Sequence, residues 1–531
     1  MEGEGWILAI LLIYFAVMIY IGYIFSKKTT DIAAYLLGGR KIGPWVTGFS
    51  ERASEMSGWM SVGIPGEGYA FGVAAMWNIV GCYLADLFSW ARMAKRLRVY
   101  TEAVGVLTLP GFFETRFRDK KATLRILITL VIIIFMVPYV SAQYVAAGKL
   151  FDATTALTYW QGIILGAIIM VTYTVLGGFF AVSWTDLLQG TIALFGIMLL
   201  AIIGIARIGF AQIFQEMARI DPVLVDPYMG MAGIAVMVTI MSYLAIGFGW
   251  PGNIHIMVRF MGIRSTKDIK KAALIALLLI SLVYTSAIMV GMSGRVAVDA
   301  IGLELADMEY ILPSLATLWL PIPIAAMTIA AALALMMSTA DSQLLIAVGG
   351  IVEDVYHRFL KKDASDAQLL FLSRVFTVIL GIGALFIAQE GGRVYLLVLF
   401  AWSGLGAAFG PPLILSLWWK RITKAGVIAG IITGTVVTIY WNQVMTPLFD
   451  YWFYELLVSF PASFLVTIVV SYMTNPPETA EQELELMQRP LEEVVEKDSS
   501  YKSVTRTGKR NLTEMEQVKA WLPALRPQTM P

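Results

Sequence analysis

The chain has 531 residues, of which 58% are hydrophobic and 15% are charged, and its formal net charge is +1. Ordinary globular proteins carry roughly 45–50% apolar and about 25% charged residues, so this chain has too few charges to cover several soluble domains. Disordered, collagen-like and coiled-coil chains are excluded by the same composition, and the balanced charge gives no case for nucleic-acid binding. Cys82, the single cysteine, cannot form an internal disulfide. The composition is typical of a polytopic integral membrane protein.

Apolar runs of about 18–25 residues, long enough to cross a bilayer core, recur over the first 473 residues. Thirteen membrane spans are predicted, at 6–25, 44–70, 72–94, 126–148, 157–180, 184–207, 232–257, 272–293, 322–348, 369–388, 395–418, 425–443 and 452–473. The first run is not expected to be a cleaved signal peptide, because it is too long and the residues before it include two glutamates and no basic residue.

The lysines and arginines near the span ends are distributed unevenly. If the N-terminus lies outside, 25 of them fall in inner loops and five in outer loops. Because basic residues favour the cytoplasmic side, the N-terminus is predicted outside, and an odd number of spans places the C-terminus in the cytoplasm. We therefore expect a multi-pass protein of the plasma (inner) membrane.

The composition changes abruptly after Pro476, where acidic and then basic polar residues replace the apolar runs. We predict a membrane domain over 1–473 and a cytoplasmic tail over 474–531. Leu484, Leu491 and Val495 recur at near-helical spacing and favour a short amphipathic helix around 479–497. A solvated tail without fixed structure is the alternative.

Two of the spans combine polar or charged residues with helix breakers. The first contains SERASEMSGW at 50–59, and the second contains GFGWPG at 247–252. The second string matches a dinucleotide-binding pattern letter by letter, but it includes Pro251 and lies in an apolar run, so we exclude that function. Two broken helices at corresponding positions are typical of inverted repeats with a binding site near the membrane midplane. The alternative is that the glycines only permit close helix packing.

A third patch, MSTADSQ at 337–343, places two hydroxyls two to three residues before a carboxylate. Ser338, Thr339 and Asp341 are hard oxygen donors that suit a small cation. Hydroxyls inside a span also bond to their own helix backbone, so this alternative stays open.

Charged groups inside the first broken span are expensive, since each costs at least about 2.5–3.5 kcal/mol at membrane depth. Arg52 and Asp86 lie at similar predicted depths on neighbouring spans, which predicts an ion pair between them. Glu51 is the local alternative partner, and an arginine whose head reaches the membrane surface is the other alternative.

Four motifs in order resemble the sodium:solute symporter family, and within it the bacterial sodium/proline symporters. They are SERASEMSGWMSVGIPG at 50–66, GGFFAVSWTD at 177–186 with Gln189, MSTADSQLL at 337–345 and GLGAAFGPP at 404–412. The resemblance extends from about residue 6 to residue 473. It implies an all-α LeuT-like membrane fold with two inverted five-helix repeats, at about 44–207 and 232–418.

The resemblance also implies a sodium ion as the coupling ion. Its expected ligands are three backbone carbonyls and two hydroxyls, from Ala53, Met56, Leu335, Ser338 and Thr339. Glu55 and Asp186 are assigned to coupling. Glu55 stands where the proline transporters have aspartate, so proton coupling remains the alternative to sodium.

The resemblance assigns the solute to the two helix breaks. The expected solute contacts are Ser57, Gly58, Trp59, Tyr139 and Trp250. Ile246, Trp250 and Ile254 stand where the proline transporters have Trp, Tyr and Pro, which leaves the solute open. The implied function is sodium-coupled uptake of a small carboxylate-bearing solute, L-proline first, with pantothenate or a monocarboxylate as alternatives.

Other function classes are less compatible with the sequence. The chain is not expected to be an enzyme, and no protein partner is predicted beyond the solute, sodium and the lipid bilayer. A transporter-like sensor is disfavoured, because the tail is too short for a kinase domain. A passive channel is the remaining alternative, and solute uptake that stops when the sodium gradient is collapsed would exclude it.

Overall fold

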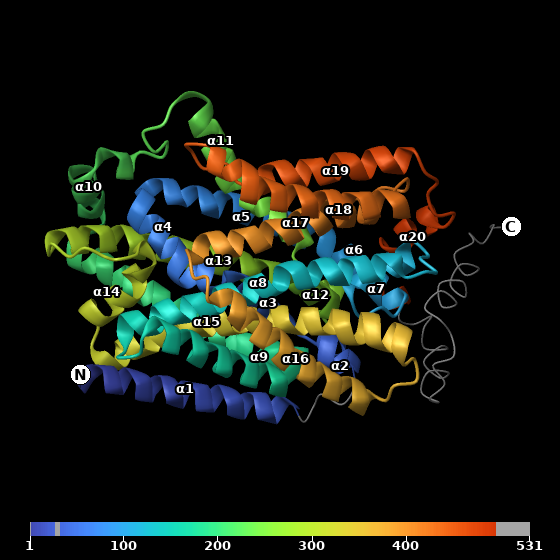
Figure 1. Cartoon of the computed structure of the whole chain (residues 1–531), viewed down its shortest axis with the longest axis horizontal. Helices are drawn as coiled ribbons and strands as arrows, with labels where there is room; N and C mark the ends of the chain where they lie inside the picture. The colour runs from blue at the N-terminus through green and yellow to red at the C-terminus, as the bar shows by residue number, and fades with distance from the viewer. Residues whose placement is uncertain (1, 27–31, 495–531) are drawn as a thin grey trace.

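The computed structural model describes residues 2–26 and 32–494. They form a bundle whose long helices run along the longest axis of the molecule (Figure 1). The α-helices are, in chain order, α1 (Glu2–Ser26), α2 (Ile32–Leu37), α3 (Pro44–Gly58), α4 (Ile64–Phe71), α5 (Trp77–Phe88), α6 (Ala94–Ala103), α7 (Leu109–Arg116), α8 (Thr123–Thr154), α9 (Tyr159–Ile208), α10 (Phe210–Ile220), α11 (Gly233–Ala245), α12 (Ile254–Gly262), α13 (Ile269–Ala300), α14 (Ile311–Trp319), α15 (Ile322–Gly349), α16 (Asp366–Ala388), α17 (Val394–Trp418), α18 (Lys424–Tyr440), α19 (Leu456–Tyr472) and α20 (Ala480–Leu486).

Short 3₁₀ or π segments join or extend these helices. They are η1 (Gly38–Arg40), η2 (Trp59–Gly63), η3 (Gly72–Met76), η4 (Ser89–Met93), η5 (Pro222–Val225), η6 (Ile246–Gly252), η7 (Thr266–Asp268), η8 (Met308–Tyr310), η9 (Gly350–Leu360), η10 (Trp441–Met445) and η11 (Thr446–Leu448). Within the described ranges there is no strand, and one isolated β-bridge pairs Ile42 with Ile263. The all-α class predicted from the sequence is confirmed.

Each of the thirteen predicted spans coincides with helical structure. By length and hydropathy, ten helical stretches of the described residues could cross a membrane. One of them, Pro44–Ala103, contains two of the predicted spans, and two shorter apolar helices, Tyr159–Val175 and Leu456–Tyr472, account for two more. The number of crossings stays a prediction.

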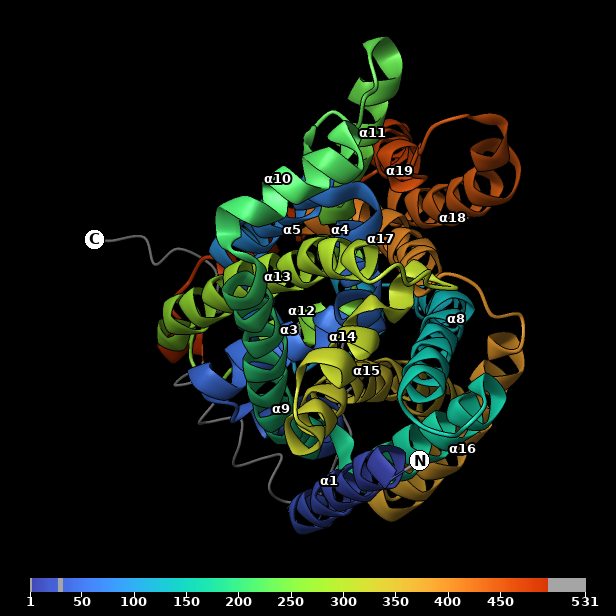
Figure 2. The same ribbon diagram turned by 90° about the vertical axis from the view of Figure 1, so that its left-hand side faces the viewer.

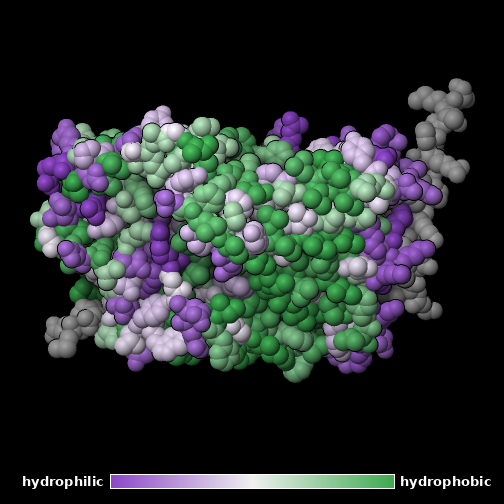
Figure 3. All heavy atoms as spheres, turned by 45° about the horizontal axis from the view of Figure 1, so that its top comes forward, coloured by the Kyte–Doolittle hydropathy of each residue, from purple (hydrophilic) through white to green (hydrophobic). Residues whose placement is uncertain are grey.

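The outer surface of the bundle is apolar over its middle. On the face shown in Figure 3, hydrophobic residues cover much of the central part, and hydrophilic residues gather toward the two ends. Large apolar side chains such as Phe371, Phe386 and Leu465 are more than 60% exposed. An exposed apolar surface of this extent is not stable in water, so these helix faces lie against lipid.

Both predicted helix breaks are present. The first interrupts the span formed by α3, η2 and α4, and the second is η6, a 3₁₀ segment between α11 and α12. α3 and α12 lie near the centre of the bundle, surrounded by α8, α9, α13, α15 and α17 (Figure 2). The two interrupted helices therefore form the centre of the bundle.

The two interrupted helices meet again at one end of the bundle. The N–H of Ile42, before α3, bonds to the carbonyl of Gly262 at 3.4 Å, and the N–H of Arg264 bonds to the carbonyl of Ile42 at 2.9 Å. The start of the first interrupted helix is thus paired with the end of the second. The two helices run in opposite directions through the bundle, as inverted repeats require.

The predicted spans 157–180 and 184–207 both lie within α9, which consists of two helices joined by a kink. Gly178, inside α9, has φ 66° and ψ 173°, a conformation that glycine adopts without a steric penalty. This residue turns the chain between the two spans, without an intervening loop.

The tail is more ordered than a solvated segment. α20 is seven residues long and is followed by chain that is packed as far as residue 494. Its buried side chains are Leu486, Met487, Leu491 and Val494, whereas Leu484 is only half-buried. The predicted helix over 479–497 is therefore interrupted at 487–490, between α20 and a helical turn at 491–494, and its predicted residue Val495 lies outside the described residues.

Candidate functional site

The first helix break is built at Ser57. This residue has φ 55° and ψ −171°, a conformation that essentially only glycine adopts without strain. The Ser57 Oγ accepts a hydrogen bond from the Trp59 N–H at 3.1 Å, and the Gly58 N–H donates to the Gln143 Oε1 of α8 at 2.7 Å. Side chains thus satisfy the backbone groups that the interrupted helix leaves unpaired.

Four of the five predicted sodium ligands meet between α3 and α15. The Ser338 hydroxyl lies 2.5 Å from the Ala53 carbonyl oxygen and 3.2 Å from the Leu335 carbonyl oxygen. The Thr339 hydroxyl lies 3.5 Å from the same Ala53 oxygen. The fifth ligand, the Met56 carbonyl, is located about one turn further along α3, where it accepts the Trp59 N–H.

The donor set fits a hard monovalent cation. Carbonyl and hydroxyl oxygens are the ligands that such ions prefer, and all four converging residues are fully buried. In the described part of the chain, no group of three or more His, Cys, Asp or Glu side chains is placed to hold a metal ion. This region therefore offers neutral oxygens to a cation, not the charged or sulfur ligands of a transition metal.

A buried cluster of charges surrounds Arg52 on the same helix. Its Nε donates to the Glu51 carboxylate at 2.7 Å, its Nη1 lies 3.2 Å from the Glu55 carboxylate, and its Nη2 lies 3.4 Å from the Asp86 carboxylate. None of these side chains is more than 3% exposed. The predicted Arg52–Asp86 ion pair and its Glu51 alternative are both present, and Arg52 does not reach the membrane surface.

Three carboxylates share one guanidinium in this cluster, so it carries an excess of negative charge. Glu55 accepts a further hydrogen bond from the Tyr284 hydroxyl at 2.5 Å. The guanidinium carbon of Arg52 lies 4.9 Å from the centroid of the Trp250 ring. Buried anions without full compensation attract a cation, and the α3 members of this cluster, Glu51, Arg52 and Glu55, lie one or two residues from Ala53 in the sequence.

Asp186, the second predicted coupling residue, is the centre of another buried network. Its Oδ2 accepts from the Ser50 hydroxyl at 2.6 Å, from the Ser54 hydroxyl at 3.2 Å and from the Arg259 Nη2 at 3.3 Å. Arg259 also donates to the Ser342 hydroxyl at 2.6 Å. The network joins α3, α9, α12 and α15, two of which carry the predicted sodium ligands.

Sequence reasoning missed Arg259 as a member of this network. Arg259 lies at the inner end of the predicted span 232–257, where the sequence places it among the 25 basic residues of the inner loops. A guanidinium that is 2% exposed cannot be distinguished from a surface arginine by its position in the sequence. Arg259 also donates to the carbonyl of His255, one helical turn earlier. The spacing between these two residues does not indicate that Arg259 is buried.

A central cavity of about 10 Å³, space for about one water molecule, lies beside the first break. It is lined by Glu55, Trp59, Tyr139, Ile246, Val398, Leu399 and Trp402. Small-molecule pockets are ordinarily about 300–1,000 Å³, so the cavity must widen to hold a solute. Glu55 is the one charged side chain among these lining residues, and three of the seven are aromatic.

The predicted solute residues divide into two groups. Trp59 and Tyr139 line the central cavity, and Ser57 and Gly58 form the break next to it. Trp250 lies behind the wall instead, with its ring 5.0 Å from Trp402 and edge-on to it. The structure therefore places Trp402, rather than Trp250, at the cavity surface.

The second break is held by close contacts to α17. A Cβ added to Gly249 would lie 1.9 Å from the Trp402 Nε1, and one added to Gly252 would lie 2.4 Å from the Leu405 carbonyl. Trp402 and its neighbours on α17 were missed as cavity residues. The one available indication in the sequence is that these residues come just before the GLGAAFGPP motif. The glycines of that motif predict close helix packing, but they do not indicate which face of the helix lies toward the cavity.

A family model, described as the sodium:solute symporter family, matches residues 35–434. The chain belongs to this family. The match includes both helix breaks and the four motifs on which the resemblance rested, so the predicted family is confirmed.

Curated members of the sodium:solute symporter family are similar over nearly their whole length. The high-affinity proline transporter PutP of Bacillus subtilis (strain 168) is 38% identical over 466 residues, which cover 87% of this chain and 97% of that protein. The osmoregulated proline transporter OpuE of the same organism is 36% identical over 476 residues, which cover 89% and 96%. Both relatives are transporters by name.

A solved structure supports the fold. The substrate-bound outward-open state of a Na⁺-coupled sialic acid symporter aligns with a TM-score of 0.75 and 20% identity, over 89% of this chain and 98% of that chain. At this identity the likeness establishes the fold alone. The LeuT-like fold class predicted for this polytopic membrane protein is confirmed.

Proposed function

We propose that the chain is a sodium-coupled symporter for the uptake of L-proline. The observation that carries this proposal is the convergence of the Ala53 and Leu335 carbonyls with the Ser338 and Thr339 hydroxyls between α3 and α15. The names of the two Bacillus relatives support proline as the solute.

Sodium bound at this site would join α3 to α15. Because α3 is interrupted at Ser57, next to the central cavity, an ion that holds α3 against α15 also fixes the wall that contacts the solute. Glu55 and Asp186 would couple sodium binding to solute binding, since each accepts a hydrogen bond from a residue on another helix. This arrangement makes solute affinity depend on sodium, as linkage requires.

The energetics of one sodium ion are sufficient for accumulation. Moving one positive charge across 100 mV supplies about 2.3 kcal/mol, and a tenfold sodium gradient adds about 1.4 kcal/mol. Together these terms support accumulation of a few hundred-fold. One sodium per solute is therefore energetically adequate.

The cavity favours a small solute with an apolar ring and charged groups. Trp59, Tyr139 and Trp402 offer aromatic walls, and Glu55 offers a negative group that suits the ammonium of an amino acid. Ile246 also lines the cavity and departs from the proline-transporter pattern. Pantothenate and monocarboxylates are therefore the competing solutes, and proton coupling is the competing ion.

The topology is part of the proposal. We place the N-terminus outside and the C-terminus in the cytoplasm, from the distribution of basic residues. The paired ends at Ile42 and Ile263 then lie on the cytoplasmic side. The membrane domain would span 1–473, with inverted repeats at about 44–207 and 232–418 and a tail over 474–531.

Purified protein in liposomes tests this function. An imposed inward sodium gradient should drive accumulation of labelled proline, and unlabelled proline should compete better than pantothenate or lactate. Uptake that persists after the sodium gradient is collapsed would indicate a channel, and uptake driven by a proton gradient alone would replace sodium as the coupling ion.

A further inference from the structure

The described part of the tail is bound to the end of the bundle where Ile42 meets Ile263. We call residues 479–494 the tail segment. Its Glu483 is 2% exposed and accepts from the Arg116 Nη1 and the Arg118 Nη2, each at 3.0 Å. The Tyr100 hydroxyl donates to the same carboxylate at 3.3 Å. A carboxylate so fully paired and buried is a docking contact, not a surface charge.

Apolar side chains accompany this ion-pair contact. Leu486, Met487, Leu491 and Val494 of the tail segment are each no more than 6% exposed and belong to the continuous hydrophobic core. Burying apolar side chains stabilises such a contact against the cost of ordering the chain. The tail segment is therefore part of the folded domain.

The tail segment bridges elements of both proposed repeats. On the side of the first repeat, the Lys95 Nζ of α6 donates to the Gln488 carbonyl at 3.2 Å. On the side of the second repeat, Lys267 of η7 pairs with Glu492 at 2.9 Å. Lys420, which follows that repeat, pairs with Glu481 at 3.2 Å. The charges are complementary, since Glu481 and Glu492 of the tail segment each meet a lysine of the membrane domain.

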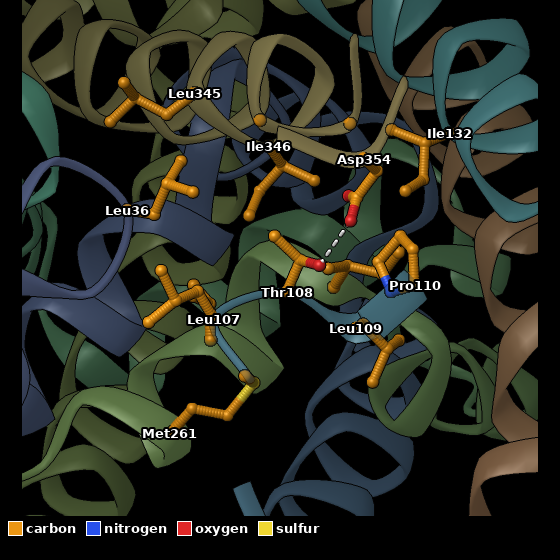
Figure 4. A pocket seen from close by; sticks show the side chains of 14 residues that line it. Leu36, Leu107, Thr108, Leu109, Pro110, Ile132, Met261, Leu345, Ile346 and Asp354 are labelled. Carbon is orange, nitrogen blue, oxygen red and sulfur yellow. Dashed lines mark hydrogen bonds between the residues drawn. The ribbon is translucent and has the colours of Figure 1, made fainter. Parts of the chain in front are cut away.

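One of the bound elements, α7, borders a cavity. A cavity of about 20 Å³, which we call the α7 cavity, is lined by the residues before and at the start of α7 together with α12, α15 and η9 (Figure 4). Leu109 and Pro110 lie on this cavity, and Met261 of α12 faces it. Arg116, the last residue of α7, holds Glu483 of the tail segment. The eight-residue helix α7 thus connects the cavity to the tail segment.

α7 has further contacts on the cavity side. Thr108, directly before α7, donates to the Asp354 carboxylate of η9 at 2.7 Å (Figure 4). Glu114 accepts from Arg358 of η9 at 2.8 Å. These contacts hold α7 over the cavity at its start and middle, whereas the tail segment holds its end.

We propose that the tail segment is an intrachain latch that keeps the α7 cavity closed by holding the end of α7 through Glu483. In transporters built from inverted repeats, one bundle of helices rocks against the rest of the protein around the binding site. The tail segment ties α7, which is bonded to η9, to α6 and η7, so it must loosen before these elements can separate at that end. This inference rests on the proposed transport function, because only a transporter needs the α7 cavity to open and close.

The test compares two glutamates of α20 that differ in burial. Glu483→Gln weakens the buried contact, whereas Glu481→Gln is the matched control, because the Glu481 and Lys420 side chains are 70% and 66% exposed and an exposed pair contributes little. Met261→Cys in a Cys82→Ala background provides a single thiol that faces the α7 cavity. Its labelling rate with N-ethylmaleimide in liposomes reports how often the cavity opens.

We expect Glu483→Gln to raise this labelling rate about tenfold, the change that corresponds to the loss of one charged hydrogen bond. Glu481→Gln should leave the rate unchanged. Equal rates in the two variants, whether raised or not, would overturn the latch. The assay needs no solute, so a failure of the latch is distinguishable from a failure of the proposed proline uptake.

A second measurement applies if Glu483→Gln does not fold. Lys95→Cys and Gln488→Cys, both at exposed positions, are joined by a reducible bis-maleimide in the Cys82→Ala background. Hydrogen exchange of the amides of residues 107–116 should slow several-fold in the cross-linked protein and recover after reduction. Exchange that is unaffected by the cross-link would overturn the proposal.

Discussion

The two helix breaks interrupt corresponding parts of the chain but are built in opposite ways. The first break has Glu51, Arg52 and Glu55 within seven residues of Ser57, all buried. The second break, GFGWPG at 247–252, has no charged residue, and its glycines pack against the Trp402 ring and the backbone of neighbouring helices. The first break is therefore rich in buried charged groups, and the second is defined by close packing.

The difference shows how one fold can divide two tasks. The proposed ion site needs oxygen atoms that are free of regular helix pairing, and the strained turn at Ser57 and the hydroxyls of α15 offer them. At the second break, Gly249 and Gly252 leave room for α17 to pack closely against the backbone. Four substitutions test this division, from the largest expected effect to the smallest.

The charge cluster of the first break should respond most strongly. Arg52→Met leaves three buried carboxylates without their cation and should lower the free energy of unfolding by about 3–5 kcal/mol. Asp86→Asn added to Arg52→Met should recover part of this loss, because one uncompensated anion is removed. SDS-driven unfolding of the purified proteins measures the cycle, with Arg92→Met as a control at an exposed position. Additive losses would mean that Arg52 and Asp86 are not coupled.

The second break should be sensitive to added volume instead of charge. Gly252→Ala places a Cβ 2.4 Å from the Leu405 carbonyl, and because backbone cannot move aside easily, we expect a loss of about 1–3 kcal/mol in unfolding free energy. Gly383→Ala is the matched control, since its Cβ would meet only a Val137 methyl at 3.9 Å. Similar unfolding free energies for these two variants would contradict the packing role.

The ion ligands should alter affinity more than stability. Ser338→Ala removes a hydroxyl that lies between the Ala53 and Leu335 carbonyls, and it should raise the sodium concentration for half-maximal uptake about tenfold. Thr339→Ala should have a smaller effect in the same direction. Ser373→Ala, which removes a buried hydroxyl bonded only within α16, controls for general effects. An unchanged sodium dependence in both α15 variants would remove them from the site.

The strain at Ser57 gives the smallest effect. Ser57→Gly should relieve a conformation that costs a non-glycine residue about 1–3 kcal/mol, but it also removes the hydrogen bond to the Trp59 N–H. Ser57→Ala loses the same bond and keeps the strain. Thermal unfolding without solute should therefore show Ser57→Gly to be more stable than Ser57→Ala by about 1 kcal/mol. The reverse order would show that the serine side chain, rather than the backbone, decides this turn.

Much of the ion site could be predicted from the sequence. The positions of both breaks follow from glycine, proline and polar residues within apolar runs, which are local properties of the chain. The pairing of Arg52 with Asp86 followed from matched depth in neighbouring spans, because helix rise is constant. The four motifs then identified which oxygens could hold sodium.

Contacts between distant elements were decided only by the tertiary structure. Arg259 reaches Asp186 across 73 residues of sequence, and Trp402 rather than Trp250 lines the cavity, because helix rotation within the bundle sets which face of a helix points inward.

The tail shows the same limit most clearly. Its sequence is acidic and polar, which is equally compatible with solvation and with docking. Glu483 is buried because Arg116, Arg118 and Tyr100 are assembled by α6 and α7, about 370 residues earlier in the chain. The cost of burying a carboxylate depends on its partners, and the fold alone brings those partners together.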